Sequence, residues 1–144
     1  YQAHQPAGLI PHPSSDRAAL ADRLCRTQLV ICRRRGIPSS PPVLKRHRPD
    51  SLLLTHAVDG FSMALDFPVV ASRRAELWAL VRELAEPVVE AGGRFYPAKD
   101  AALPGELYRA TFRDGQLDRF RDLKKRLDPD GMLRSALAER FLGG

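Results

Sequence analysis

The sequence has little of what marks membrane-spanning or metal-binding proteins. No stretch approaches the roughly eighteen consecutive apolar residues that a membrane-spanning helix needs, and no charged and apolar leader is recognisable at its start. Its four histidines show no His-x-x-x-His spacing. We therefore expect no transmembrane segment, no signal peptide and no metal site.

Cysteine is also scarce, with only Cys25 and Cys32 in 144 residues. The two lie seven residues apart in what we expect to be one helix, a rise of about 10 Å, and a disulfide does not span that separation. We predict free core thiols in a reducing compartment, hence a cytoplasmic location, with peripheral membrane attachment as the alternative.

Basic residues exceed acidic ones, giving a formal net charge of +6. They gather at residues 33–35 and 45–48 but interleave with acids elsewhere, as in residues 114–128. This pattern argues against an extended nucleic-acid surface. It leaves open that the basic clusters guide an anionic substrate or contact an acidic protein surface.

Alternation and helical periodicity predict an α+β fold for the first two thirds of the chain. We expect strands at residues 1–5, 43–47, 61–67 and 94–96, a helix that Gly36 ends, and a second helix capped by Ser72. The order is strand, helix, strand, strand, helix, strand. This βαββαβ pattern predicts a ferredoxin-like antiparallel sheet with two helices on one face.

Beyond residue 99 the pattern is helical only. Helices are predicted at residues 106–112, 116–127 and 135–141, with a turn at residues 128–131, whose proline and glycine favour a bend. This tail has too few apolar residues for a core of its own. We therefore expect it to dock on another part of the protein.

A single lysine follows the last predicted strand, in residues 92–100 (GGRFYPAKD). Two glycines suit the end of a helix, and Pro97 ends strand pairing. Lys99 then lies where a strand leaves the sheet, a typical place for site chemistry. The alternative is a solvated lysine beside Asp100, since most lysines are exposed.

Three blocks occur in order: residues 60–68 (GFSMALDFP), residues 92–100, and residues 125–135 (KRLDPDGMLRS). Together they resemble the C-terminal part of FAD-linked oxidases of the vanillyl-alcohol oxidase and p-cresol methylhydroxylase superfamily. The most similar branches are the sugar-lactone oxidases and the decaprenylphosphoryl-ribose oxidases. In their order and spacing, the three blocks extend the resemblance over roughly two thirds of the chain.

The resemblance implies that residues 1–95 belong to the substrate cap domain and residues 96–144 complete the FAD-binding domain. Most of the FAD site is then expected upstream, outside this chain, so this part alone should bind no FAD tightly and be inactive. The resemblance also implies that Lys99 is catalytic beside the flavin ring, and that Tyr96 and Ala98 line the cofactor with it. An ammonium group there would stabilise the negative charge of the reduced flavin.

For the substrate, the resemblance implies contacts from Gln2, Lys45 and Ser62. Ala64 departs from the decaprenylphosphoryl-ribose branch, which has cysteine there. The implied function of the full-length enzyme is oxidation of a CH–OH group of a sugar, aldonolactone or polyol by hydride transfer to FAD, with the upstream FAD-binding domain as partner. Two alternatives stay open: a stand-alone basic module that binds RNA or an acidic protein, and an assembly domain without chemistry.

Overall fold

The computed structural model describes residues 2–6, 17–99, 102–112 and 115–143, and for residues 2–6, 17 and 99 it describes the backbone only. Its centre is an antiparallel sheet of β1 (Gln2–Pro6), β2 (Val43–His47) and β3 (Gly60–Pro68) in the order β1-β3-β2. In the register, Gln2 is opposite Pro68 and Lys45 is opposite Ser62. The predicted α+β class with an antiparallel sheet is confirmed.

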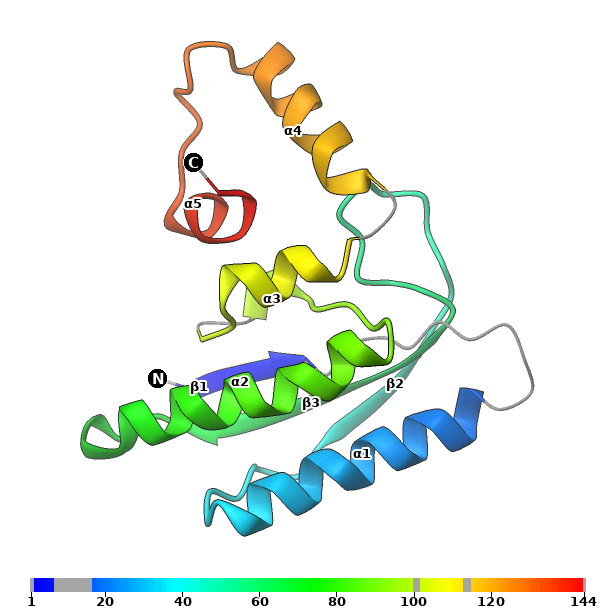
Figure 1. The fold of residues 1–144 in the computed structure, drawn as a ribbon, viewed down its shortest axis with the longest axis vertical. Coiled ribbons are helices and arrows are strands. Elements are labelled where there is room, and N and C mark those ends of the chain that lie inside the picture. Colours follow the sequence, from blue (N-terminus) through cyan, green and yellow to red (C-terminus); the bar gives the residue numbers. More distant parts are fainter. Residues whose placement is uncertain (1, 7–16, 100–101, 113–114, 144) are drawn as a thin grey trace.

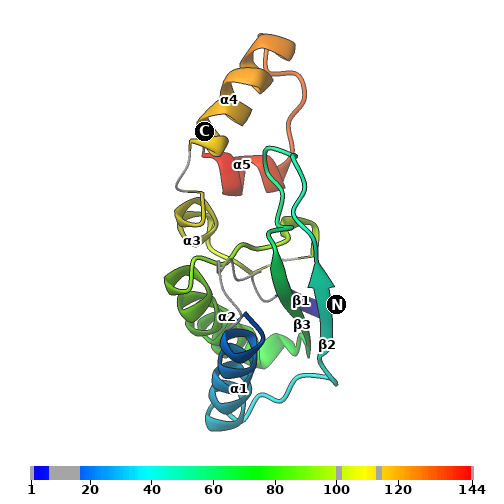
Figure 2. The same cartoon turned by 90° about the vertical axis from the view of Figure 1, so that its right-hand side faces the viewer.

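Two helices cover one face of this sheet: α1 (Arg17–Arg34) and α2 (Arg74–Glu90), the latter preceded by the short 3-10 helix η1 (Ala71–Arg73). Figure 2 shows both on the same side of the strands. The reason is the alternation of β3, whose Met63, Leu65 and Phe67 are buried against them. This core contains Ile31, Cys32, Ile37, Met63, Leu65, Phe67, Leu77, Leu80, Val81 and Leu84.

The fourth strand predicted at residues 94–96 does not form in the described part of the chain. After α2 the chain turns at Gly92 (φ 72°), runs without regular structure, and enters the 3-10 helix η2 (Pro97–Lys99), which contacts β1. The Arg94 guanidinium donates to the Thr55 carbonyl at 3.2 Å, and Phe95 is fully buried. These contacts to loop and core, with Pro97 lacking an N–H, replace sheet pairing.

The prediction that Ser72 caps the second helix is also wrong. Ser72 lies inside η1, and α2 begins after Arg73 without a side-chain cap.

The C-terminal tail is helical, as predicted, with α3 (Gly105–Ala110), α4 (Gln116–Leu127) and α5 (Ala136–Leu142). α3 contacts α2 and α5 contacts α3, whereas α4 extends beyond them (Figure 1). A second core joins the helices through Ala21, Leu24, Ala85, Val88, Phe95, Leu103, Tyr108 and Phe141. Docking of the tail is thus seen for α3 and α5, while apolar side chains in and after α4 stay exposed, among them Leu127, Met132 and Leu133.

Both cysteines are free thiols, as predicted, with Cys25 half-buried and Cys32 buried. Burial raises the pKa of the Cys32 thiol to about 11, so this group is a packing residue rather than a nucleophile. Within the described residues, no helix has the length and apolarity to cross a bilayer.

Candidate active site

The sheet face turned away from α1 and α2 carries the polar residues of β3. Ser62, Ala64 and Asp66 alternate with the buried Met63, Leu65 and Phe67, and are only partly buried. Lys45 of the neighbouring strand is directly opposite Ser62. Directly opposite residues of antiparallel strands are side-chain neighbours. The structure therefore brings together two of the three residues predicted to bind substrate.

A row of four side chains begins at this point, and we call it the histidine cluster: Ser62, His47, His56 and Tyr96. His47 Nε2 and Ser62 Oγ are 2.7 Å apart, a hydrogen bond. The His56 ring meets the His47 ring edge-on at a centroid distance of 5.4 Å and tilts against the Tyr96 ring at 4.5 Å. The cluster thus connects Ser62, predicted to bind substrate, with Tyr96, predicted to line the cofactor.

His56 reaches this position because the loop between β2 and β3 is held by its own polar groups. The Thr55 hydroxyl donates to Asp50 at 2.7 Å, and the Leu52 N–H donates to the same carboxylate at 2.9 Å. Arg94, in the segment after α2, donates to the Thr55 carbonyl of the same loop. The hydrogen bond from Thr55, followed by that from Leu52, lowers the pKa of Asp50, so this carboxylate stays charged and holds the loop.

Both imidazoles are biased towards their neutral form. Burial lowers the pKa of His47, and the nearby charges of Lys45 and Arg46 lower it further. Burial is also the main cause that lowers the pKa of His56; His47 adds to the effect, and Asp50 opposes it. Near neutral pH both rings can therefore accept a proton.

The other predicted site residues lie elsewhere. Gln2 is opposite Pro68, six residues along β3 from Ser62 and so about 20 Å away. Ala98 is exposed in η2, and Tyr96, just before η2, exposes 37% of its surface. Lys99 is the last residue of η2, which contacts β1; its side chain and Asp100 lie outside the described part.

His47 and His56 are not among the site residues predicted from the sequence, because their spacing does not match that of metal ligands. His47 could have been found from strand alternation, since it is two residues after Lys45 in β2. His56 gives no such signal, because the fold of its loop decides its position. Among the described residues, no three His, Cys, Asp or Glu side chains gather to hold a metal ion.

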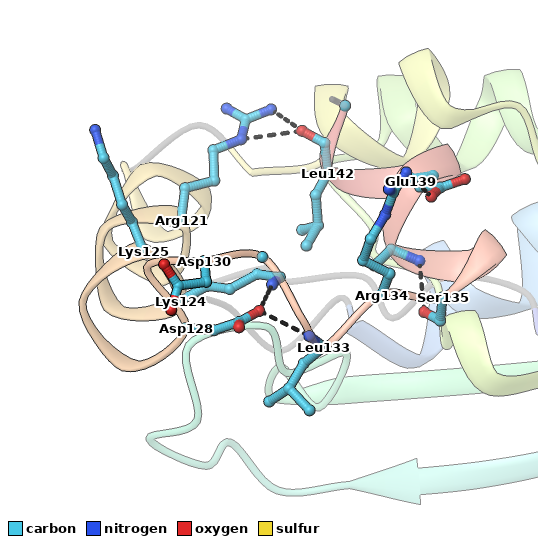
Figure 3. Close-up of a pocket in the computed structure, with 13 residues that line it drawn as sticks. Arg121, Lys124, Lys125, Asp128, Asp130, Leu133, Arg134, Ser135, Glu139 and Leu142 are labelled. Carbon is cyan, nitrogen blue, oxygen red and sulfur yellow. Dashed lines mark hydrogen bonds and ion pairs between the residues drawn. The ribbon is translucent and has the colours of Figure 1, made fainter.

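A separate hollow of about 560 Å³ lies between α4, the loop after it and α5, and none of its lining residues belongs to the histidine cluster. Figure 3 shows Arg121 reaching from α4 to the Leu142 carbonyl, to which its Nε donates at 3.0 Å. Asp128 binds Lys124 at 2.7 Å and accepts the N–H groups of Met132 and Leu133. The pKa of Asp128 is lowered, mainly by Lys124. These contacts fix the shape of the tail.

No family model matches the chain. The chain is 36% identical over 107 residues to a Streptomyces coelicolor protein described as an uncharacterized protein in mprA 5'region. The matched stretch is 74% of this chain and 28% of that protein. The chain is also 33% identical over 88 residues to the decaprenylphosphoryl-beta-D-ribose oxidase of Mycolicibacterium smegmatis. That matched stretch is 61% of this chain and 18% of the oxidase. The chain thus matches less than a third of the length of either relative, and one of the two is an oxidase.

Proposed function

We propose that this chain is the C-terminal part of an FAD-dependent oxidoreductase that oxidises a CH–OH group of a sugar, aldonolactone or polyol. The observation that carries the proposal is the 33% identity over 88 residues to an oxidase named for a ribose derivative. Residues 1–95 then belong to the substrate cap, and residues 96–144 complete the flavin domain. The exposed apolar residues in and after α4 support this division, because apolar surface of this kind is usually covered by a partner.

The residues around η2 fit a flavin. Tyr96 offers a partly exposed aromatic ring for contact with a flat ring system, and the small, exposed side chain of Ala98 leaves space beside it. When bound, FAD supplies the hydride acceptor. Lys99, in the same short segment, would stabilise the negative charge that reduction creates.

Substrate contacts are proposed for Lys45 and Ser62, whose opposite positions in β2 and β3 support a shared role. An ammonium group and a hydroxyl are both suited to binding sugar oxygens. For Gln2 the resemblance is the only support, because its register position is about 20 Å from Ser62.

The alternative of an RNA-binding module has less support. Modules of that kind stack bases on aromatic side chains of the open sheet face. The described open-face positions of β3 are instead Ser62, Ala64 and Asp66, none of them aromatic. The acidic Asp66 also opposes phosphate binding at this face.

Substitution of Lys99 tests the proposed chemistry in the full-length flavoprotein. We expect Lys99→Met to slow flavin reduction by substrate about a hundredfold, because one preorganised charge partner of the transition state is lost. Substrate affinity should change much less. Stopped-flow absorbance of the flavin measures the rate and its dependence on substrate concentration.

Lys125→Met is the matched control, since it makes the same change at an exposed lysine in α4, a different element from η2. It should reduce flavin at the wild-type rate. If Lys99→Met also keeps the wild-type rate, the role of Lys99 is refuted. If full-length protein binds no flavin, or no sugar-like substrate reduces the flavin, the proposed function itself is refuted.

A further inference from the structure

The hydrogen bond between Ser62 and His47 has the parts of a proton relay. The two atoms are 2.7 Å apart, and the serine belongs to the open face, where Lys45 stands opposite. With His47 Nε2 unprotonated, the Ser62 hydroxyl donates to it and its oxygen is left to accept a hydrogen bond from a ligand. A ligand hydroxyl at Ser62 is then one serine away from an imidazole.

The surroundings of His47 favour the unprotonated ring. Lys45 and Arg46 precede His47 on the same strand. Burial lowers the pKa of the ring, and these two charges lower it further. Arg46 is itself paired with Asp59 and donates to the Gly60 carbonyl at 3.1 Å. Besides the two imidazoles, the described charged and titratable side chains on β2, on β3, in the loop between them and in the segment after α2 are Lys45, Arg46, Arg48, Asp50, Asp59, Asp66, Arg94 and Tyr96.

The second imidazole holds the first in place. His56 packs edge-on against His47, and the Tyr96 ring packs against His56 at a centroid distance of 4.5 Å. The loop that carries His56 is fixed by Asp50 and Thr55. The His47 ring is thereby held between the Ser62 hydroxyl and the His56 ring, which limits its rotation and keeps Nε2 on the serine.

We propose that Ser62 and His47 form the proton relay of the reaction, with His47 as the final acceptor of the substrate's hydroxyl proton. The inference rests on the proposed function. The substrate hydroxyl passes its proton to Ser62 Oγ, and the Ser62 proton passes to His47 Nε2. The carbon loses its hydrogen with two electrons as hydride to the flavin, and the C–O single bond becomes a C=O bond. His47 becomes an imidazolium and later releases its proton to water.

Removal of the relay should change both the rate and its pH dependence in the full-length flavoprotein. In the wild type, we expect flavin reduction to slow as pH falls and His47 becomes protonated, with an inflection below the ordinary histidine value of about 6.5. His47→Phe and Ser62→Ala should each slow the high-pH rate about a hundredfold or more. In both variants this inflection should disappear.

A second measurement follows the imidazole itself. In protein labelled with ¹⁵N at histidine, NMR titration should give His47 a pKa below the ordinary value, with Nε2 unprotonated near neutral pH. The Ser62→Ala variant should shift the His47 ring resonances, because the hydrogen bond to Nε2 is lost. This readout depends on neither flavin nor substrate.

Two controls separate the relay from simple support of the fold. Ser51→Ala makes the same chemical change at an exposed serine of the loop and should keep rate and pH profile. His56→Phe keeps an aromatic ring beside His47 and should keep the inflection, although it can lower the rate. The relay is overturned if His47→Phe reduces flavin with the wild-type pH profile, or if His47 is protonated on Nε2 throughout. Absence of flavin reduction by every sugar-like substrate would instead refute the proposed function, and the relay with it.

Discussion

Gly105, the first residue of α3, determines how closely two C-terminal helices approach. A Cβ added there would overlap the backbone carbonyl oxygen of Arg140 in α5 and lie 2.8 Å from the Arg109 guanidinium. That guanidinium donates to the same Arg140 carbonyl at 3.1 Å, so the contact is backbone on one side and hydrogen-bonded on the other. Neither partner can move without loss of a contact, so glycine is required by space rather than by its dihedral angles.

We therefore expect Gly105→Ala to separate α5 from α3. Overpacking of a tight contact costs about 1–3 kcal/mol of unfolding free energy. Urea denaturation of the 144-residue chain measures the loss, and hydrogen exchange should show lower protection in α5. Gly36→Ala is the comparison, because a Cβ there meets nothing within 4 Å and the strain of its φ of 62° is confined to the end of α1. Unchanged protection of α5 in Gly105→Ala would contradict the argument.

At the scale of elements, one carboxylate links the two helices that cover the sheet. Glu83 of α2 pairs with Arg34 and Arg35, at and just beyond the C-terminal end of α1, and the Arg35 contact is 2.6 Å. The Glu83 side chain is 19% exposed, whereas those of the arginines are 67% and 49% exposed. Solvent therefore screens the pair, and its contribution is modest.

Glu83→Gln should lower the unfolding free energy by about 0.5–1 kcal/mol at low salt and by less at high salt, because ions screen the exposed arginines. Chemical denaturation at two salt concentrations measures this. Glu86→Gln makes the same change at an exposed glutamate of α2 for which the described structure gives no ion pair, and should have no salt-dependent effect. Equal losses in the two variants would show that the link between α1 and α2 is not electrostatic.

Local signals explain which elements could be predicted from the sequence. The strand at residues 43–47 and the helix at residues 116–127 are observed with the predicted bounds, and Ser135 caps α5 by accepting the Ala138 N–H at 3.1 Å. Strand pairing is not local. Residues 94–96 alternate as a strand does, yet the contacts of Arg94 and Phe95 are made with a loop and with the core, which no alternation pattern encodes.

The same distinction applies to the candidate site. The position of Lys45 beside Ser62 follows from alternation once β2 and β3 pair, and both were predicted site residues. The position of His56 depends on the Asp50–Thr55 hydrogen bond inside a loop, which composition does not predict. The connection from Ser62 to Tyr96 therefore became visible only in the structure.

For the whole molecule, the two histidines of the cluster tie stability to pH. Their pKa values are lowered in the folded chain, mainly by burial, whereas in the unfolded chain they return to about 6.5. Between the lowered values and about 6.5 the unfolded chain binds more protons, so the unfolding free energy falls as pH decreases through this range. Asp50 and Asp128 also have lowered pKa values. Their contribution to the unfolding free energy is fully present above the ordinary aspartate pKa of 3.8 and is lost only at lower pH.

We therefore predict that the chain loses stability as pH falls from about 6.5 towards the lowered pKa values of the two imidazoles. Because both rings are partly exposed, screening keeps the contribution of each below about 1 kcal/mol. Urea denaturation at half-unit pH steps measures the loss. The double variant His47→Phe/His56→Phe should have a flatter profile in this range and the same acid loss below pH 4, since the aspartates are unchanged. If its stability falls as steeply as that of the wild type just below pH 6.5, other groups carry the dependence and the two imidazoles are not held neutral.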